Sequence, residues 1–437
     1  MAGKLILTRK KVRKLQRILY QQAKTKPNWK AWSLYGDICQ SEFIEEAMSR
    51  VLKNKGGSGV DCYSVEIMEA NWDLFRDSLQ TELKDKSYRP SPVLRVKIPK
   101  SDGGERSLGI PTVKDRVVQM LLVIVLEPIF EAEFHDESYG YRPQKKAQDA
   151  IDSINKALYY GKKVAIEADL SKYFDTVNHT RLLKLIRGKV SDGAILKLVK
   201  QFLRVPVVER EKHGKERILS NSRQGVPQGG VISPLLANLY LDKLDKAVNS
   251  LDPSRVKMVR YADDFAILVK NGLEMVILER VKAWLEKAGL ELNLKKTKIT
   301  DVGQKGKVEF LGFELSERLS KKGRTYIHCQ PSKKALGRFT GKIREKLHRY
   351  STWQEATEVV EEVNRITRGW GNYFHHGHSQ DSFRMMNYWL KERLRNWLYI
   401  KHKKRSRYSK YKVYPDSHLT DNLGLYLLPS TPKWLNR

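Results

Sequence analysis

The chain has 437 residues, of which 41% are hydrophobic, so it encodes a folded protein and not a disordered one. Its length allows about two to four domains. It contains 82 lysines and arginines but only 50 aspartates and glutamates, which leaves a formal net charge of +32. Such a surplus repels itself in a compact protein, and its usual reason is a polyanionic partner. Nucleic acid is the main candidate, and an acidic membrane surface is the second.

Membrane insertion and disulfide bonding are both disfavoured. The longest uninterrupted apolar run, Met120–Leu126, is far too short to cross a bilayer, and the N-terminus lacks the apolar core of a signal peptide. The three cysteines, Cys39, Cys62 and Cys329, are too scattered for a disulfide framework or a C-x-x-C zinc module. We therefore expect a reducing compartment, either a bacterial cytoplasm or an organelle matrix, and no membrane partner.

The first predicted elements are mainly helical. The basic residues 1 to about 40 predict a helix with a break at Pro27, and a second helix is predicted to end at the Gly-rich segment 55–59. Residues 92–111 predict a β-hairpin, because two alternating segments flank the turn sequence DGG. A further helix is predicted from about Val113 to Glu133.

The middle of the chain predicts strands alternating with helices. Residues 163–169 predict a strand with Asp169 on its solvent-facing side, near its C-terminal end. A loop rich in Gly and Pro at 225–234 leads into an amphipathic helix. VRYADDFAILV at 259–269 predicts a pair of strands, 274–287 a helix, and 308–315 another strand.

Three amphipathic helices after about residue 330 predict a small bundle. The first carries Leu336, Phe339 and Ile343 on one face, and the others cover 354–368 and 383–399. The segment KHKKRSRYSKYK at 401–412 follows, with tyrosines between its basic residues. Basic groups bind phosphates and aromatic rings stack on unpaired bases, so this segment predicts a nucleic-acid contact. A solvated charged tail is the alternative.

Two adjacent carboxylates, Asp263 and Asp264, lie at the centre of the apolar segment 259–269. An Asp-Asp turn between two strands is the ordinary explanation, since Asp bonds its local backbone. A metal site is the second, because paired carboxylates stay ionised together when a cation neutralises them. If the strand that ends at Asp169 lies beside this pair, three carboxylates meet at one edge. They could then hold two Mg²⁺ ions for attack of a 3′-hydroxyl on an α-phosphate.

Six segments occur in the order of reverse transcriptase motifs: SYGYRP, ADLSKYFDTVNH, QGVPQGGVISPLLANLYL, YADD, LNLKKTKI and FLGF. Over roughly residues 40 to 400 the chain resembles the reverse transcriptases of group II introns, also called maturases. GWGNYF at 369–374, assigned to the third helix of the bundle, resembles their maturase segment.

The fold that the resemblance implies is α+β, a right-hand polymerase with fingers, a palm built on an antiparallel sheet, and an α-helical thumb. We expect an N-terminal extension with the first finger region over 1–85, fingers over 86–168, the palm over 169–325, the thumb or maturase domain over 326–400, and a basic nucleic-acid-binding tail over 401–437.

The resemblance also implies roles for individual residues. Asp169, Asp263 and Asp264 match the carboxylates that bind two Mg²⁺ ions, with Mn²⁺ as a possible substitute and Asp264 as the weaker ligand. The residues matched to the nucleotide site are Lys100, Arg106, Phe174, Gln228 and Lys296. The residues matched to the primer and template are Arg142, Leu311 and Gly312.

Several of these roles have a plainer alternative. Phe174 would exclude a 2′-hydroxyl, or it is simply a core residue. Lys100 and Arg106 would grip the triphosphate, or they are edge-strand charges. Lys296 would assist proton transfer, or it is a solvated charge at a helix end. Arg142 would bond the template backbone, or it supports the palm.

A cluster of histidines at 375–378 is the last candidate site. It suggests a metal site only weakly, because no Cys or acidic residue is nearby in sequence; packing or RNA contact is the better interpretation.

The expected function is an RNA-directed DNA polymerase that also assists intron splicing and retrohoming. Its partners would be group II intron RNA, an RNA template with a DNA primer, a DNA target and dNTPs. The alternatives are an RNA-binding splicing factor with an inactive polymerase, and a repurposed relative such as a CRISPR-associated enzyme. Since residues 413–437 contain no paired cysteines, we expect no DNA-nicking domain.

Overall fold

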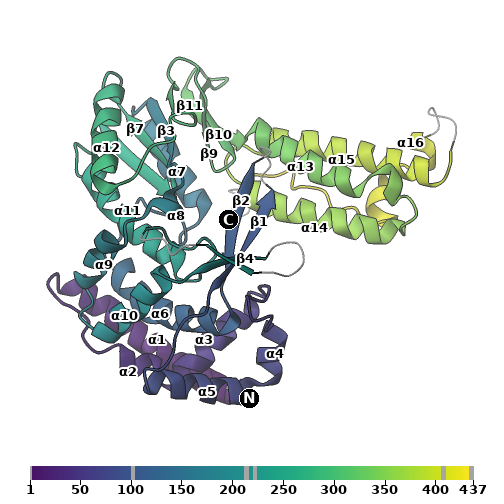
Figure 1. Cartoon of the computed structure of the whole chain (residues 1–437). Coiled ribbons are helices and arrows are strands. Elements are labelled where there is room, and N and C mark those ends of the chain that lie inside the picture. Colours follow the sequence, from purple (N-terminus) through teal and green to yellow (C-terminus); the bar gives the residue numbers. More distant parts are fainter. Residues whose placement is uncertain (1, 100–103, 211–215, 220–223, 405–409, 433–437) are drawn as a thin grey trace.

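The protein is described by a computed structural model that covers residues 2–99, 104–210, 216–219, 224–404 and 410–432. A central sheet joins a helical lower part to a helical arm (Figure 1). Helices and antiparallel strands are both abundant, which confirms the α+β class. Within these residues no helix is both long and apolar enough to cross a membrane.

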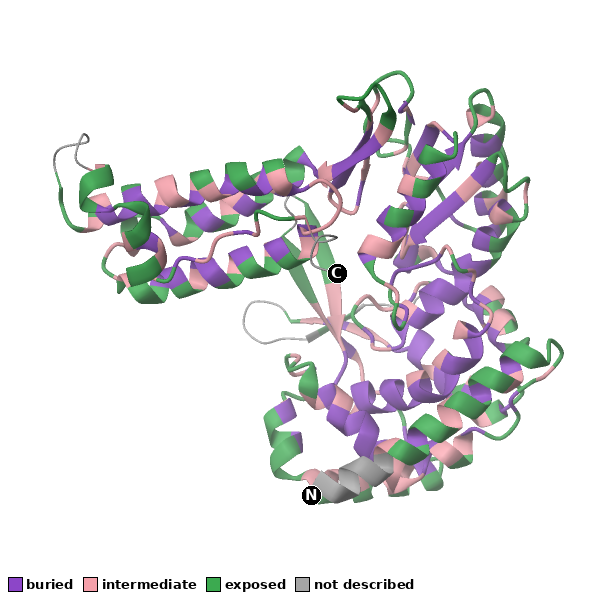
Figure 2. Cartoon of the chain, turned by 180° about the vertical axis from the view of Figure 1, so that it is seen from behind, coloured by how far each residue is buried: buried purple, intermediate pink, exposed green. Residues whose placement is uncertain are grey.

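The central sheet has four antiparallel strands in the order β6-β7-β3-β8. They cover Val256–Tyr261, Asp264–Val269, Val164–Asp169 and Lys298–Asp301. Ile166 of β3 packs into the core of the lower part, whereas Ala165 packs into a second core with α7 (Ala147–Tyr159). The face expected to meet solvent is thus covered, since Ala165 is fully buried, and the sheet separates two cores (Figure 2).

The lower part is built around α6 (Val113–Glu131), whose apolar run is almost completely buried. The helices α1 (Ala2–Thr25) and α3 (Ser41–Lys53) pack against it, and residues of both, such as Val12 and Phe43, belong to its core. The same core continues to α11 (Ser233–Asn249) and α12 (Glu274–Ala288) beside the central sheet. The remaining helices here are α2 (Tyr35–Ile38), α4 (Val65–Ala70), α5 (Trp72–Lys84), α8 (Tyr173–Thr176), α9 (His179–Arg187) and α10 (Gly193–Leu203).

A second sheet, β2-β1-β4-β5, stands between the lower part and the arm (Figure 1). β1 (Val93–Pro99) pairs antiparallel with β2 (Glu105–Ile110), which confirms the predicted hairpin. β4 (Val207–Arg210) runs parallel to β1 and pairs with β5 (Glu216–Leu219). The turn of the hairpin, and with it Lys100, lies outside the described residues.

A small sheet connects the central sheet to the arm. The strand expected at 308–315 is in fact two strands, β9 (Val308–Phe310) and β10 (Phe313–Leu319), and β11 (Thr325–Pro331) completes the sheet. The chain reverses between them because Leu311 and Gly312 have positive φ angles of 49° and 82°. Glycine adopts such angles without strain.

Three helices form the arm: α13 (Lys333–Lys346), α14 (Ala356–Phe374) and α15 (Gln380–Lys401). GWGNYF closes α14, so its assignment to the third helix was wrong. Rings from all three helices, Phe339, Trp370, Phe374 and Phe383, pack together in the centre of the arm.

The C-terminal segment folds back onto the arm after α16 (Lys410–Val413) and includes a π-helical turn at His418–Asn422. Leu419, Leu425 and Leu428 are buried in the core of the arm. Residues 414–428 therefore pack against the arm, and the nucleic-acid binding predicted for 401–437, of which 405–409 and 433–437 lie outside the described residues, stays a prediction.

Candidate active site

Three aspartates gather at one edge of the central sheet. β3 and β7 are neighbours, and their register places Asp169 directly opposite Asp264. Directly opposed side chains lie on the same face of a sheet, about 5 Å apart at Cβ. Asp263 belongs to the two-residue turn between β6 and β7. The predicted position of β3 beside the aspartate turn is therefore confirmed, whereas a metal site shared by the three residues stays a prediction.

The aspartate turn is held in an unusual conformation. Its first residue, Ala262, has a φ of 60°, a value that this kind of hairpin turn requires but that side chains with a Cβ disfavour. Gly140 of SYGYRP lies against it: a Cβ at Gly140 would be 2.4 Å from the backbone nitrogen of Ala262. The glycine is therefore needed for the close approach of these two segments.

A buried arginine, which the sequence analysis did not single out, fixes the same turn. Arg260 donates to the carbonyl of Ala262 at 2.8 Å and to Oδ1 of Asn238 at 2.9 Å. It also forms an ion pair with Asp245, in which both side chains are at most 2% exposed. The sequence feature that could have identified Arg260 is its position as a charged residue within an apolar strand, directly before YADD.

Electrostatic repulsion dominates the edge. Burial, which removes water from the carboxyl group, raises the pKa of Asp263, and the negative charge of Asp169 raises it further. Burial and the negative charges of Asp263 and Asp169 together raise the pKa of Asp264 to about 6. Lys296 partly offsets this charge, since its Nζ donates to Oδ2 of Asp169 at 2.5 Å.

These carboxylates suit a hard divalent cation, which takes oxygen ligands and would relieve their mutual repulsion. Among the described residues, however, no three ligand side chains already converge on a single point. Lys296 donates to Oδ2 of Asp169, and Oδ1 of the same carboxylate takes no part in that hydrogen bond. The donor set therefore fits Mg²⁺ or Mn²⁺ by its chemistry.

Arg106 and Gln228, predicted for the nucleotide site, are brought together from β2 and the loop before α11. Nε of Arg106 donates to Oε1 of Gln228 at 3.2 Å, and the backbone nitrogen of Gly109 donates to the Gln228 carbonyl at 2.6 Å. Gly229, with a φ of 107°, allows this contact, because a Cβ there would be 2.3 Å from the Gly109 carbonyl oxygen. A cleft of about 260 Å³ opens beside Gln228.

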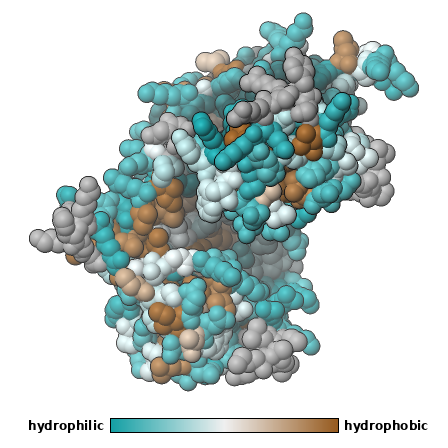
Figure 3. Space-filling model, turned by 90° about the vertical axis from the view of Figure 1, so that its right-hand side faces the viewer, coloured by the Kyte–Doolittle hydropathy of each residue, from teal (hydrophilic) through white to brown (hydrophobic). Residues whose placement is uncertain are grey.

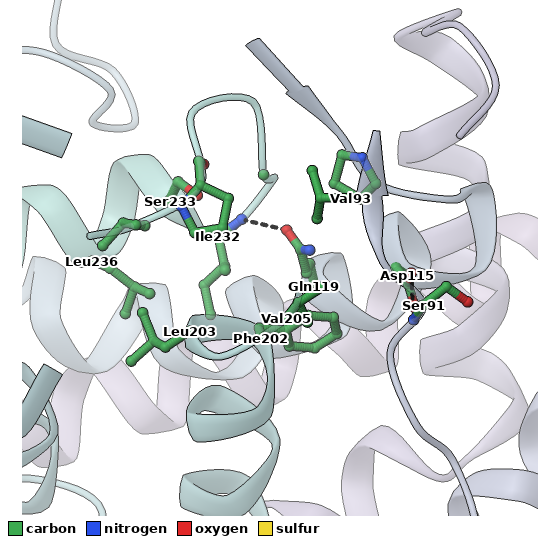
Figure 4. Close-up of a pocket in the computed structure, with 14 residues that line it drawn as sticks. Ser91, Val93, Asp115, Gln119, Phe202, Leu203, Val205, Ile232, Ser233 and Leu236 are labelled. Carbon is green, nitrogen blue, oxygen red and sulfur yellow. Dashed lines mark hydrogen bonds between the residues drawn. The ribbon is translucent and has the colours of Figure 1, made fainter. Parts of the chain in front are cut away.

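The other end of this loop is tied to α6. Gln119 accepts a hydrogen bond from the backbone nitrogen of Ile232 at 3.3 Å, inside a small cavity also lined by Asp115 and Ser233 (Figure 4). Phe174 is 8% exposed and belongs to the lower core, while its carbonyl accepts from the backbone nitrogen of Val226 at 2.6 Å. Phe174 therefore packs in the core and also borders the loop, and its exclusion of a 2′-hydroxyl stays a prediction.

Arg142 does not occupy a template position. Its side chain is 3% exposed, pairs with Glu131 at 2.7 Å and donates to the carbonyls of His135 and Ser138. These partners lie within the protein, so we correct its expected role to that of a structural support.

Tyr141, the residue after Gly140, was missed in the sequence analysis. The residue is 55% exposed; partial burial raises the pKa of its hydroxyl, and the charge of Asp263 raises it further.

A larger cleft of about 730 Å³ runs from Asp264 into the arm. Leu311 and Gly312 line it, together with basic and aromatic residues of α13 and α14: Arg338, Lys342, Arg365, Trp370 and Tyr373. The hydroxyl of Tyr373 donates to the Leu311 carbonyl at 3.0 Å, which fixes the turn to the arm. Figure 3 shows the hollow between the arm and the lower part.

The histidines at 375–378 have protein partners. His376 bonds Asp152 at 2.8 Å, His375 bonds the Thr431 carbonyl at 2.9 Å, and His378 accepts from the backbone nitrogen of Cys329 at 3.3 Å. They join the arm to α7 and β11, which favours the packing interpretation over a metal site.

Comparison with known proteins identifies the class first. Residues 98–315 match the family model described as reverse transcriptase (RNA-dependent DNA polymerase), and residues 336–414 match the group II intron, maturase-specific domain. The right-hand polymerase fold follows from the first match.

Two bacterial relatives narrow the family. Protein YkfC of Escherichia coli K12 is 35% identical, over 71% of this chain and 90% of YkfC. The group II intron-encoded protein LtrA of Lactococcus lactis subsp. cremoris is 30% identical, over 66% of this chain and 57% of LtrA. The chain belongs to the family of group II intron reverse transcriptases and maturases.

Proposed function

We propose that this chain is an active RNA-directed DNA polymerase that extends a DNA primer on an RNA template. The observation that carries this proposal is the pairing of Asp169 with Asp264 beside Asp263, at the rim of a cleft lined by basic residues. Such a cleft suits the phosphates of a primer–template duplex. The central sheet with its helices would be the palm, the β1–β2 hairpin part of the fingers, and the arm the thumb. Because the expected boundary at 168/169 cuts β3, we place the start of the palm before α7.

The proposed mechanism assigns one task to each group. Asp169, Asp263 and Asp264 would hold Mg²⁺, which supplies charge neutralisation at the α-phosphate when it is bound. Arg106 would offset triphosphate charge, and Gln228 would contact the nucleotide; in support, Gln228 lines the cleft and Arg106 donates a hydrogen bond to it. Phe174 would exclude a 2′-hydroxyl, and Lys296 would hold or pass a proton at Nζ.

Leu311 and Gly312 would support the primer end, because they line the cleft that reaches Asp264. Lys100, beyond the described part of β1, remains a proposed ligand of the triphosphate.

We further propose that the protein binds a group II intron RNA and assists its splicing and mobility. The maturase-specific match over the arm and the net charge of +32 support this second activity. If polymerase activity were absent, the protein would be a splicing factor alone. If intron binding were absent, it would be a repurposed polymerase.

Primer extension on an RNA template separates these possibilities. Asp263→Ala should lower kcat by at least about 1,000-fold, because it removes a carboxylate on which charge neutralisation in the transition state depends. Asp264→Ala should have a smaller effect. RNA binding, measured in parallel, should be unchanged in both variants. Extension by Asp263→Ala at a rate near that of the wild type would refute the polymerase assignment.

A further inference from the structure

The strand ends of the central sheet that lie farthest from the aspartates carry a group of cationic side chains. β3 begins at Val164 and ends at Asp169, so these strand ends lie about 17 Å from the carboxylates along the strand. Val164, Val256 and Val269 all point into the lower core. Side chains alternate along a strand, so Lys163, Arg255, Lys257 and Lys270 point to the other face, the one covered by α7.

The register brings these cations into one row. Val269 pairs with both Val164 and Val256, so Lys270 continues the row between Lys163 and Arg255, and its backbone nitrogen donates to the Arg255 carbonyl at 3.0 Å. Lys162 lies beside them, just after α7. Burial lowers the pKa of Lys162, and the charges of Lys257 and Lys270 lower it further.

Only part of this positive charge is neutralised. Lys163 pairs with Glu317 at 2.6 Å, and Lys257 pairs with Glu137 at 2.8 Å. Lys162, which is 7% exposed, forms no ion pair with an acid in the described part of the chain, and neither do Arg255 and Lys270. Asp252 offsets part of their charge, since it raises the pKa of Lys162, and the charges of Arg255 and Lys270 contribute to lowering the pKa of Asp252. The cations therefore outnumber the acids beside them, and an anion at this position would offset the remaining positive charge.

Two exposed tyrosines flank the cations at the end of α7. Tyr159 is 66% exposed and Tyr160 is 71% exposed, with their ring centroids 5.4 Å apart and their planes at 82°. The C-terminus of a helix favours a neighbouring cation, which would account for Lys162 alone. It does not account for the row on β6 and β7 or for the two solvated rings. Phosphates next to unpaired bases match all of these features.

We propose that this surface, formed by Tyr159, Tyr160, Lys162, Arg255, Lys257 and Lys270, binds a single-stranded segment of RNA. The cations contact phosphates, and the tyrosines stack on unpaired bases. This inference rests on the proposed function, because the RNA envisaged is the intron RNA. It adds a contact on the far side of the sheet, which lets the protein hold that RNA while the active-site cleft is in use.

Binding of an RNA stem-loop with a large unpaired loop, compared with a blunt duplex of equal charge, tests the proposal. In the full chain, Lys162→Gln/Lys270→Gln should weaken stem-loop binding about tenfold and reduce the slope of log K against log salt by about 1.4, at ~0.7 per phosphate contact. The control is Lys197→Gln/Lys200→Gln, which removes two exposed lysines from α10. A loss no larger than that of the control would overturn the proposal.

The tyrosines give an independent test that does not disturb the core. Tyr159→Ala/Tyr160→Ala should weaken stem-loop binding about tenfold and leave duplex binding unchanged. Primer extension on a short annealed template should stay within about twofold of the wild type. Equal weakening for stem-loop and duplex would refute the stacking role.

A competition experiment with inorganic phosphate distinguishes a site for the free ion. If phosphate binding depends on Lys162 and Lys270 while RNA affinity does not, the RNA proposal fails. Asp263→Ala provides the separation from the proposed polymerase, since it should abolish extension and leave binding at this surface intact.

Discussion

Single residues decide the geometry of the catalytic edge, and Gly140 offers the sharpest test. Gly140→Ala would place a Cβ 2.4 Å from the backbone of Ala262, so the turn that carries Asp263 must shift. Because a displacement of about 1 Å can cost a hundredfold in rate, we expect kcat for primer extension to fall about 100-fold. The dissociation constant of RNA should stay unchanged.

Gly193→Ala is the matched control, since no atom lies within 4 Å of a Cβ built there. Full activity of Gly140→Ala would show that the turn tolerates displacement.

The ion pair of Arg260 with Asp245 makes a second prediction. Arg260→Ala leaves a carboxylate buried without its partner and removes the donor to Ala262, so the free energy of unfolding should fall by about 3–5 kcal/mol. Urea denaturation measures this change. Arg255→Ala, at the exposed start of the same strand, should stay within about 0.5 kcal/mol of the wild type. If Arg260→Ala lowers the free energy of unfolding by less than about 1 kcal/mol, Arg260 does not fix the turn as proposed.

At the scale of elements, the contact between β11 and the α14–α15 loop should depend on pH. The rings of His328 and His378 stack at 4.7 Å. Burial lowers the pKa of both, and a charge on His328 lowers the pKa of His378 further. An unfolded histidine titrates near pH 6.5, so between the folded and unfolded pKa values the unfolded state binds more protons. This contribution to stability is complete above about pH 6.5 and is lost as the pH falls through the folded pKa.

We therefore expect urea denaturation to show a drop in stability from pH 8 to pH 5.5, and His378→Gln should flatten that drop. His348→Gln is the control, since His348 is exposed at the end of α13. The same pH dependence in His378→Gln and in the wild type would exclude this pair as its source.

Local patterns predicted those elements that depend on neighbours in sequence. The β1–β2 hairpin follows from DGG between alternating segments, and α6 follows from an apolar run that a helix can bury. The break at Leu311–Gly312 was missed because VEFLGFEL alternates as one strand would, and only the contacts of Gly312 and Leu311 with α14 require the reversal.

The candidate active site also combines features that local sequence predicts with features that depend on tertiary contacts. Strand and turn patterns placed Asp169 at the end of one strand and Asp263 and Asp264 at a turn, but only the resemblance to reverse transcriptases implied that these strands are neighbours. The role of Arg142 could not be predicted from sequence, since tertiary packing decides whether its side chain faces solvent or Glu131. The segment 414–428 was assigned to the basic tail although it contains five leucines. Three of them, Leu419, Leu425 and Leu428, are buried in the core of the arm, where their contacts come from residues distant in sequence.

For the whole molecule, the net charge of +32 predicts opposite effects of salt on the free and the RNA-bound protein. Repulsion among the cations of the free protein is screened by salt, so its melting temperature should rise between about 50 and 300 mM NaCl. Bound RNA should raise stability by about 2.7 kcal/mol at a hundredfold excess over Kd. That gain should shrink over the same range, because salt weakens phosphate contacts.

Thermal denaturation with and without RNA measures both trends in one series. Asp263→Ala changes the net charge by a single unit, so it should follow the wild type in both conditions. A free protein whose melting temperature falls with added salt would mean that its cations are already neutralised by ion pairs within the fold. The argument from net charge to a polyanionic partner would then fail.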